Sequence, residues 1–187
     1  EYVSAMMLAV SMMFLRFMIL ILIFSTSIFL NIYPYLLIMS ATAAGIGIFI
    51  HKKHTIKGER EVIEETETES NPLEFKVALI FALLFVVFTF LTHYTLVYAG
   101  TGGLSILSIA TGLSDITPFI LNLLQGGNIP ATIVGACIMQ AIISNIVVNM
   151  FYAIFFSSRR KEMLPYVWKG FLTVIGVNAV LLLIYYF

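Results

Sequence analysis

Charged side chains are scarce in this chain of 187 residues. Asp, Glu, Lys and Arg make up 11% of it, and half of them fall within residues 51–71. The formal net charge is zero, so the charge balance gives no reason to expect a nucleic-acid partner. Hydrophobic residues make up 60% of the chain and the mean hydropathy is +1.02, far above that of a soluble domain. The shortage of charge therefore predicts a polytopic membrane protein.

The sequence also lacks the patterns that enzymes and metal sites leave. It has one cysteine, Cys137, so no internal disulfide can form. No nucleophile–base arrangement, Gly-rich phosphate loop or His/Cys metal spacing is present, and no second acid accompanies Asp115. We therefore expect neither an enzyme nor a cofactor. The first apolar run is too long for a signal peptide, and because residue 1 is Glu, we expect a processed chain or a piece of a longer one.

Long apolar runs occupy most of the chain, each near the roughly 20 residues that a membrane-spanning helix needs. They predict an all-α polytopic membrane protein with five full spans and one broken segment. The spans are predicted at residues 3–30, 35–50, 72–99, 130–156 and 165–187. Three units follow from this division: a two-helix unit at 1–50, a hydrophilic cytoplasmic loop at 51–72, and a larger unit at 73–187 that contains the broken segment 101–127.

The broken segment is the most informative part of the chain, because Gly112-Leu113-Ser114-Asp115 divides an apolar stretch into two pieces too short to span a membrane. Basic residues favour the cytoplasmic side, and they occur in two connections, at 52–60 and 159–161. The connections at 27–33, 100–103 and 125–130 have none. The segment should then begin and end on the outer side, as a re-entrant helical hairpin. Each half of about 10–12 residues is about 15–18 Å long, which reaches the middle of the bilayer.

A weak internal repeat supports this topology. Four residues of the second predicted span recur in the last one at a constant offset: Pro34, Tyr35, Thr42 and Gly45 correspond to Pro165, Tyr166, Thr173 and Gly176. The charge argument gives the two helix pairs opposite orientations, and inverted repeats are common in transporters. Chance similarity in apolar sequence is the alternative. The first copy lacks its own third span and hairpin, which favours a homodimer or an upstream membrane domain.

Several short strings occur in an order that resembles a known family. They are Met13-Phe14-Leu15-Arg16, Asn71-Pro72-Leu73-Glu74-Phe75, Gly112-Leu113-Ser114-Asp115, and Ser144-Asn145 followed by Arg159-Arg160. The chain thereby resembles the uncharacterised membrane domain that follows MgtC/SapB-type domains in bacterial and archaeal proteins. The resemblance implies the plasma (inner) membrane of a prokaryote and, through the neighbouring domain, magnesium. This chain has Thr117 where the family usually has a second acid and Asn149 where it usually has Lys, which weakens a divalent-cation site built from two carboxylates.

Arg16 and Asp115 are the charged residues predicted to lie deep in the membrane. Because a buried charge without a partner is costly, we expect the two to pair. The pair is either a fixed salt bridge or a switch that opens when an ion or proton binds Asp115. Alternatively, Ser114 or Asp115 caps the returning half-helix, and the carbonyl groups near Thr111 and Gly112 face a cation.

Polar residues also follow one face of the predicted span at 130–156, where Asn145 and Asn149 are four residues apart. They either hold helices together or line a pathway that Asn122 faces. The predicted pathway residues are Arg16, Ser114, Asp115, Thr117, Asn122, Ser144, Asn145 and Asn149. The predicted function is a transporter or channel for a small solute or inorganic ion. The alternative is a non-transporting membrane subunit that regulates another membrane protein.

Overall fold

The computed structural model describes residues 2–54, 73–126, 129–157 and 164–186, and these residues are helical apart from short turns. The helices are α1 (Tyr2–Phe24), α2 (Thr26–His54), α3 (Leu73–Thr111), α4 (Thr117–Gln125), α5 (Ala131–Ser157) and α6 (Leu164–Tyr186). Five of them, all but α4, are long and apolar enough to cross a membrane. The chain is therefore an all-α, multi-pass membrane protein, which confirms the predicted fold class.

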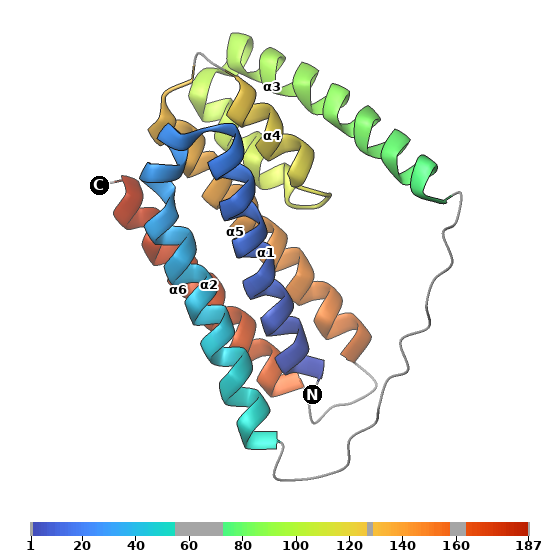
Figure 1. Cartoon of the computed structure of the whole chain (residues 1–187), viewed down its shortest axis with the longest axis vertical. Helices are drawn as coiled ribbons and strands as arrows, with labels where there is room; N and C mark the ends of the chain where they lie inside the picture. The colour runs from blue at the N-terminus through green and yellow to red at the C-terminus, as the bar shows by residue number, and fades with distance from the viewer. Residues whose placement is uncertain (1, 55–72, 127–128, 158–163, 187) are drawn as a thin grey trace.

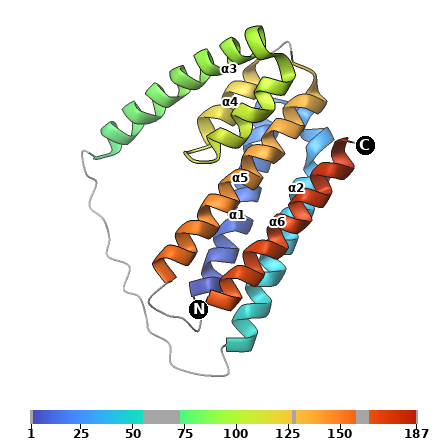
Figure 2. The same cartoon turned by 180° about the vertical axis from the view of Figure 1, so that it is seen from behind.

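Two antiparallel helix pairs form the body of the molecule. Figure 1 shows α1 rising from the N-terminus and α2 descending beside it, whereas α5 descends and α6 rises to the C-terminus. The opposite view in Figure 2 shows α5 in front of α1 and α6 in front of α2. α1 and α5 run in opposite directions, and so do α2 and α6, as the predicted inverted repeat requires. The repeat itself stays a prediction.

Small residues join α1 and α2. The Ser4 hydroxyl donates a hydrogen bond to the Gly47 carbonyl over 2.8 Å, and the Ser11 hydroxyl donates to the Ser40 carbonyl over 3.0 Å. Ser4, Ser11 and Ser40 are all buried. Because lipid is as apolar as a Leu side chain, helices in membranes associate through such close, small, hydrogen-bonding residues.

The boundary between the first two spans was wrong in the sequence analysis. The structure breaks at Ser25 and not across residues 27–33, which belong to α2. The Ser25 hydroxyl accepts a hydrogen bond from the backbone N–H of Ile28 over 3.5 Å, at the start of the new helix. Pro34, which preceded the predicted second span, lies inside α2; prolines are tolerated within membrane helices. Neither connection carries Lys or Arg, so the topology argument is unchanged.

The predicted break after the third span is present at Gly100. Its φ of 60° and ψ of −153° interrupt α3, and a positive φ is accessible to glycine at little cost. Figure 1 shows the first part of α3, residues 73–99, starting apart from the body and approaching it toward its end, and the rest folding back beside α4. Residues 101–125 thus form a helical hairpin whose tip is 112–116.

The hydrophilic loop is largely outside the described residues. Residues 51–54, with Lys52 and Lys53, complete α2, whereas residues 55–72 and 158–163, which contain the other basic residues used for the topology, are not described. The division into three units and the cytoplasmic position of the loop therefore stay predictions.

Candidate functional site

The hairpin tip closes the first half-helix with its own backbone. The N–H groups of Leu113 and Ser114 donate to the carbonyls of Ala110 and Thr111 over 3.3 and 3.0 Å. The Ser114 hydroxyl also lies 3.3 Å from the Thr111 carbonyl. The carbonyl groups that were expected to face a cation at this helix end are thus already engaged by the turn.

Asp115 organises the start of α4. One carboxylate oxygen, Oδ1, accepts hydrogen bonds from the backbone N–H of Thr117 over 2.9 Å and from the Thr117 hydroxyl over 2.7 Å. A bond from the N–H two residues ahead is an Asx turn, the local arrangement that lets aspartate begin a helix. The sequence analysis offered Ser114 or Asp115 as the cap of this helix, but the N-cap of α4 is Ile116, with no side-chain cap hydrogen bond. Asp115 instead orders the turn just before the helix.

Arg16 does not pair directly with Asp115, contrary to expectation. Its guanidinium Nη2 donates to the Thr117 hydroxyl over 2.7 Å, and that hydroxyl donates onward to Asp115. Thr117 is buried, whereas the side chains of Arg16 and Asp115 are exposed. A neutral hydroxyl therefore connects two opposite charges, at the position where the resembling family usually has a second acid.

α5 holds the hairpin from the other side. The Ser144 hydroxyl donates to the Ile109 carbonyl over 2.7 Å, and the Asn145 amide donates to the Gly112 carbonyl over 3.3 Å. A Cβ on Gly112 would collide with the Ser144 side chain and lie 2.7 Å from the backbone nitrogen of Asn145. Glycine is thus required for this close approach. Ser144 is the midpoint of α5, so the tip reaches half the length of that helix.

The polar face of α5 acts mainly as a contact between helices. Asn149 donates to the side-chain oxygen of Asn145 over 3.1 Å, which orients the Asn145 amide toward the hairpin. Asn149 also borders an apolar groove of about 330 Å³ between α1 and α5. The expectation that these residues hold helices together is consistent with these bonds, and only Asn149 faces an open space.

Asn122 faces α3 and not the polar face of α5, contrary to expectation. Its amide donates to the Thr89 hydroxyl over 2.6 Å. The two residues border a cavity of about 380 Å³ that His93 and Gln125 also line. The ring of Phe119, on α4, stacks edge-on against Phe88 at 6.0 Å between centroids. These contacts attach the first part of α3 to the hairpin.

Sequence reasoning missed the hydroxyl groups that surround Cys137. Ser105 and Ser108, on the first arm of the hairpin, are within hydrogen-bonding range of its thiol, and Ser108 and Cys137 are fully buried. The signal was available as the spacing of Leu104, Ser108 and Thr111, which lie on one helical face. Within the described residues, no group of three or more His, Cys, Asp or Glu side chains forms a metal site.

The candidate site thus consists of a hairpin tip held halfway along α5 and linked to α1 by Thr117. Ser114, Asp115 and Arg16 are exposed beside one another on one side of the molecule. Of the eight predicted pathway residues, the structure brings together seven, and Asn122 lies apart at the other end of α4.

Comparison with known proteins places the chain in a family without an assigned function. The chain is 24% identical over 153 residues to an uncharacterized protein of Aquifex aeolicus (strain VF5), a match that covers 80% of this chain and 63% of that protein. No solved structure matches. The family model for a domain of unknown function, DUF4010, matches residues 1–157. The chain therefore belongs to the DUF4010 family.

Proposed function

We propose that this protein is a transporter or channel for a small solute or inorganic ion, with its site at the tip of the hairpin. The observation that carries the proposal is the exposure of Arg16 and Asp115 at the middle of the helix bundle. An α5 of 27 residues is about 40 Å long, so its midpoint falls near the centre of a hydrocarbon core of about 30 Å. Charged side chains exposed at that depth are costly in lipid and typically border a water-filled path.

The proposed mechanism uses Thr117 as the movable link. In the described state its hydroxyl satisfies both charges, accepting from Arg16 and donating to Asp115. A cation or proton that binds Asp115 weakens the bond from Thr117, since the carboxylate then has a competing partner. Because the charge of Asp115 is then neutralised, it no longer attracts the Arg16 guanidinium, and the Arg16–Thr117 bond that joins the tip to α1 weakens, while Ser144 and Asn145 still hold the tip to α5. Passage of the solute is coupled in this way to a change at one contact.

The proposed topology follows the charge pattern of the sequence. The hairpin enters from the outer side as a re-entrant segment, and the ends of α2 and α6 that lie near the basic clusters face the cytoplasm. The membrane is the plasma (inner) membrane of a prokaryote, and magnesium is one candidate ion because of the resemblance to MgtC/SapB-associated domains. We propose no enzymatic activity and no cofactor.

Charge movement in proteoliposomes tests the proposal. The purified protein is placed on a solid-supported membrane and exposed to concentration jumps of Na⁺, K⁺, Mg²⁺, Cl⁻ and H⁺. We expect a current with at least one of these ions and its loss in Asp115→Asn, which keeps the Asx turn but removes the charge. Asn31→Ala is the matched control, because Asn31 is exposed and bonds only within its own helix. A folded Asp115→Asn protein with the wild-type current would exclude Asp115 from the site.

A second candidate function is a non-transporting subunit that binds and regulates another membrane protein. The first part of α3 favours it, because large apolar side chains are exposed on several sides of this helix, among them Leu83, Phe90, Val97 and Tyr98. A partner helix or a second copy of the chain would cover them. In that case the purified protein gives no current with any of the five ions, and it co-purifies with the partner in stoichiometric amount.

A further inference from the structure

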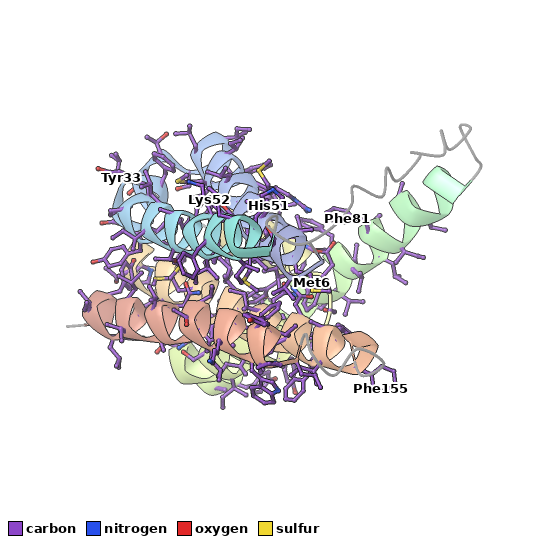
Figure 3. The ribbon with its side chains drawn as sticks, turned by 90° about the horizontal axis from the view of Figure 1, so that it is seen from below. Met6, Tyr33, His51, Lys52, Phe81 and Phe155 are labelled. Atoms are coloured by element: carbon purple, nitrogen blue, oxygen red, sulfur yellow. The ribbon has the colours of Figure 1, made fainter. Side chains whose placement is uncertain are left out.

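The apolar groove between α1 and α5 has no occupant among the described residues. Met6, Ala9, Val10 and Met13 line it from α1, and Asn149 and Tyr152 line it from α5. Figure 3 looks at the end of the molecule where the groove opens and shows Met6 between α1 and the end of α5 that carries Phe155. An almost wholly apolar lining suits the side chains of another helix better than a hydrated path.

The internal repeat relates this groove to the face of α5 that contacts the hairpin. Pro34 and Pro165 are separated by 131 residues, and the other residues of the repeat share this offset. The four α1 residues that line the groove correspond under the same offset to four residues of α5, which are Cys137, Gln140, Ala141 and Ser144. The groove was not used to find the repeat, so the correspondence is an independent observation.

Two of these four α5 residues contact the hairpin. Cys137 lies against Ser105 and Ser108 of its first arm, and Ser144 binds the Ile109 carbonyl. α1 and α5 run in opposite directions (Figure 1), and side chains of both line the groove. The face of α5 that contacts the hairpin therefore corresponds to a face of α1 that has the opposite orientation along the molecule. The groove lies along this face of α1.

We propose that the groove seats a second helical hairpin, inverted relative to residues 101–125 and carried by sequence that directly precedes α1 in the polypeptide. The order of elements favours this source, because the described hairpin is followed at once by α5 and α6, as the second hairpin would be by α1 and α2. The Aquifex relative also extends well beyond the matched region, which covers 63% of it. A second copy of the chain does not fit, since a copy inserted with the same orientation presents its hairpin from the same side of the membrane.

The second hairpin completes the candidate site. Its tip would end near Asn149 and Arg16, opposite the tip that carries Asp115, so that the two turns approach each other from opposite sides of the membrane. The exposed charges of Arg16 and Asp115 would then lie between two tips. This inference concerns the architecture and does not depend on transport activity.

Site-specific photo-crosslinking tests the inference in the polypeptide as its gene encodes it. Benzoylphenylalanine replaces Met13, which lines the groove, or Met12, which is 64% exposed on the neighbouring face of α1. After irradiation in native membranes, crosslinked peptides are identified by mass spectrometry. We expect position 13 to yield a peptide from before residue 1, and position 12 to yield lipid adducts with loss of that product. Ala9 provides a second groove position if the variant at 13 does not fold.

Three results would overturn the inference. Groove positions that crosslink only to lipid leave the groove without a protein occupant. Products confined to α1–α6 or to a second copy of the chain identify a different occupant. A gene that encodes no interrupted apolar segment directly before residue 1 removes the proposed source. Because the readout is a covalent product, a failure to detect ion currents has no bearing on any of these results.

Discussion

The two parts of α3 are both largely apolar but differ in how their side chains are packed. Before Gly100, within residues 78–99, Phe88 and Thr92 are the only buried side chains, although this stretch is rich in Leu, Val and Phe. After Gly100, the arm of only eleven residues buries Leu104, Ser108 and Thr111. The packed part is the one that contains serine and glycine. Apolar character brings a helix into the membrane, and small and polar residues then decide which helix it contacts.

The largest expected change in stability comes from making the same substitution in both parts of the helix. Leu104 is fully buried and Leu83 is 64% exposed. Leu104→Ala should lower the free energy of unfolding by about 2 kcal/mol, the lower end of the range for buried leucine, because lipid is as apolar as the interior and only the packing is lost. Leu83→Ala should change it by less than about 0.5 kcal/mol. Equilibrium unfolding in mixed micelles with SDS measures both values.

An equal loss for the two leucine variants would contradict the comparison. It would mean that the first part of α3 is packed in the micelle, most simply against a partner or a second copy. Measurement over a range of protein concentrations separates these cases, since only an oligomer becomes more stable as concentration rises.

A smaller effect is expected at the link between the hairpin and α1. Thr117→Val keeps the shape of the side chain and removes the hydroxyl that joins Arg16 to Asp115. A buried polar group left without its partner costs about 1–3 kcal/mol, and because Arg16 and Asp115 are exposed we expect a loss of about 1 kcal/mol, at the lower end of that range. Thr173→Val is the control, because that hydroxyl bonds to the Lys169 carbonyl of its own helix. Combining Thr117→Val with Arg16→Ala should cost less than the sum of the two single losses, and strict additivity would show that the residues do not interact.

The smallest effect is expected where the two parts of α3 are connected through α4. Asn122→Ala removes the hydrogen bond to Thr89, which contributes about 0.5–1.5 kcal/mol. Spin labels on the first part of α3 and on α5 should show a broader distance distribution in this variant. Labels on α1 and α5 report a pair of helices that the change does not touch. An unchanged distribution on α3 would mean that the Phe88–Phe119 contact alone holds that helix.

The positions of the helices could be predicted from the sequence, but most of their contacts could not. The five spans, the break at Gly100 and the turn that contains Asp115 follow from apolar length and from glycine. Asn122 was assigned to the wrong neighbour because an apolar sequence in lipid has no hydrophobic face to orient it.

The link through Thr117 required knowledge of three-dimensional distance. The sequence analysis paired Arg16 with Asp115 because each buried charge needs a partner. A pattern of charges does not reveal that a neutral hydroxyl lies between them. The seam of Ser4, Ser11, Ser40 and Gly47 was visible as small residues seven apart on each helix. The regular spacing of small residues along a helix was therefore the sequence feature that indicated helix contacts. The same feature indicated the buried face of the first arm of the hairpin.

Gly100 also bears on how the chain enters the membrane during synthesis. The apolar stretch from Ala78 to Thr111 has 34 residues, and as a straight helix it would be about 51 Å long, well beyond a hydrocarbon core of about 30 Å. One residue with a left-handed backbone lets the excess turn back on itself. If the insertion machinery passed the residues after Gly100 across the membrane as a further span, every later helix would take the opposite orientation. The turn at Gly100 therefore determines which of two opposite orientations α5 and α6 adopt.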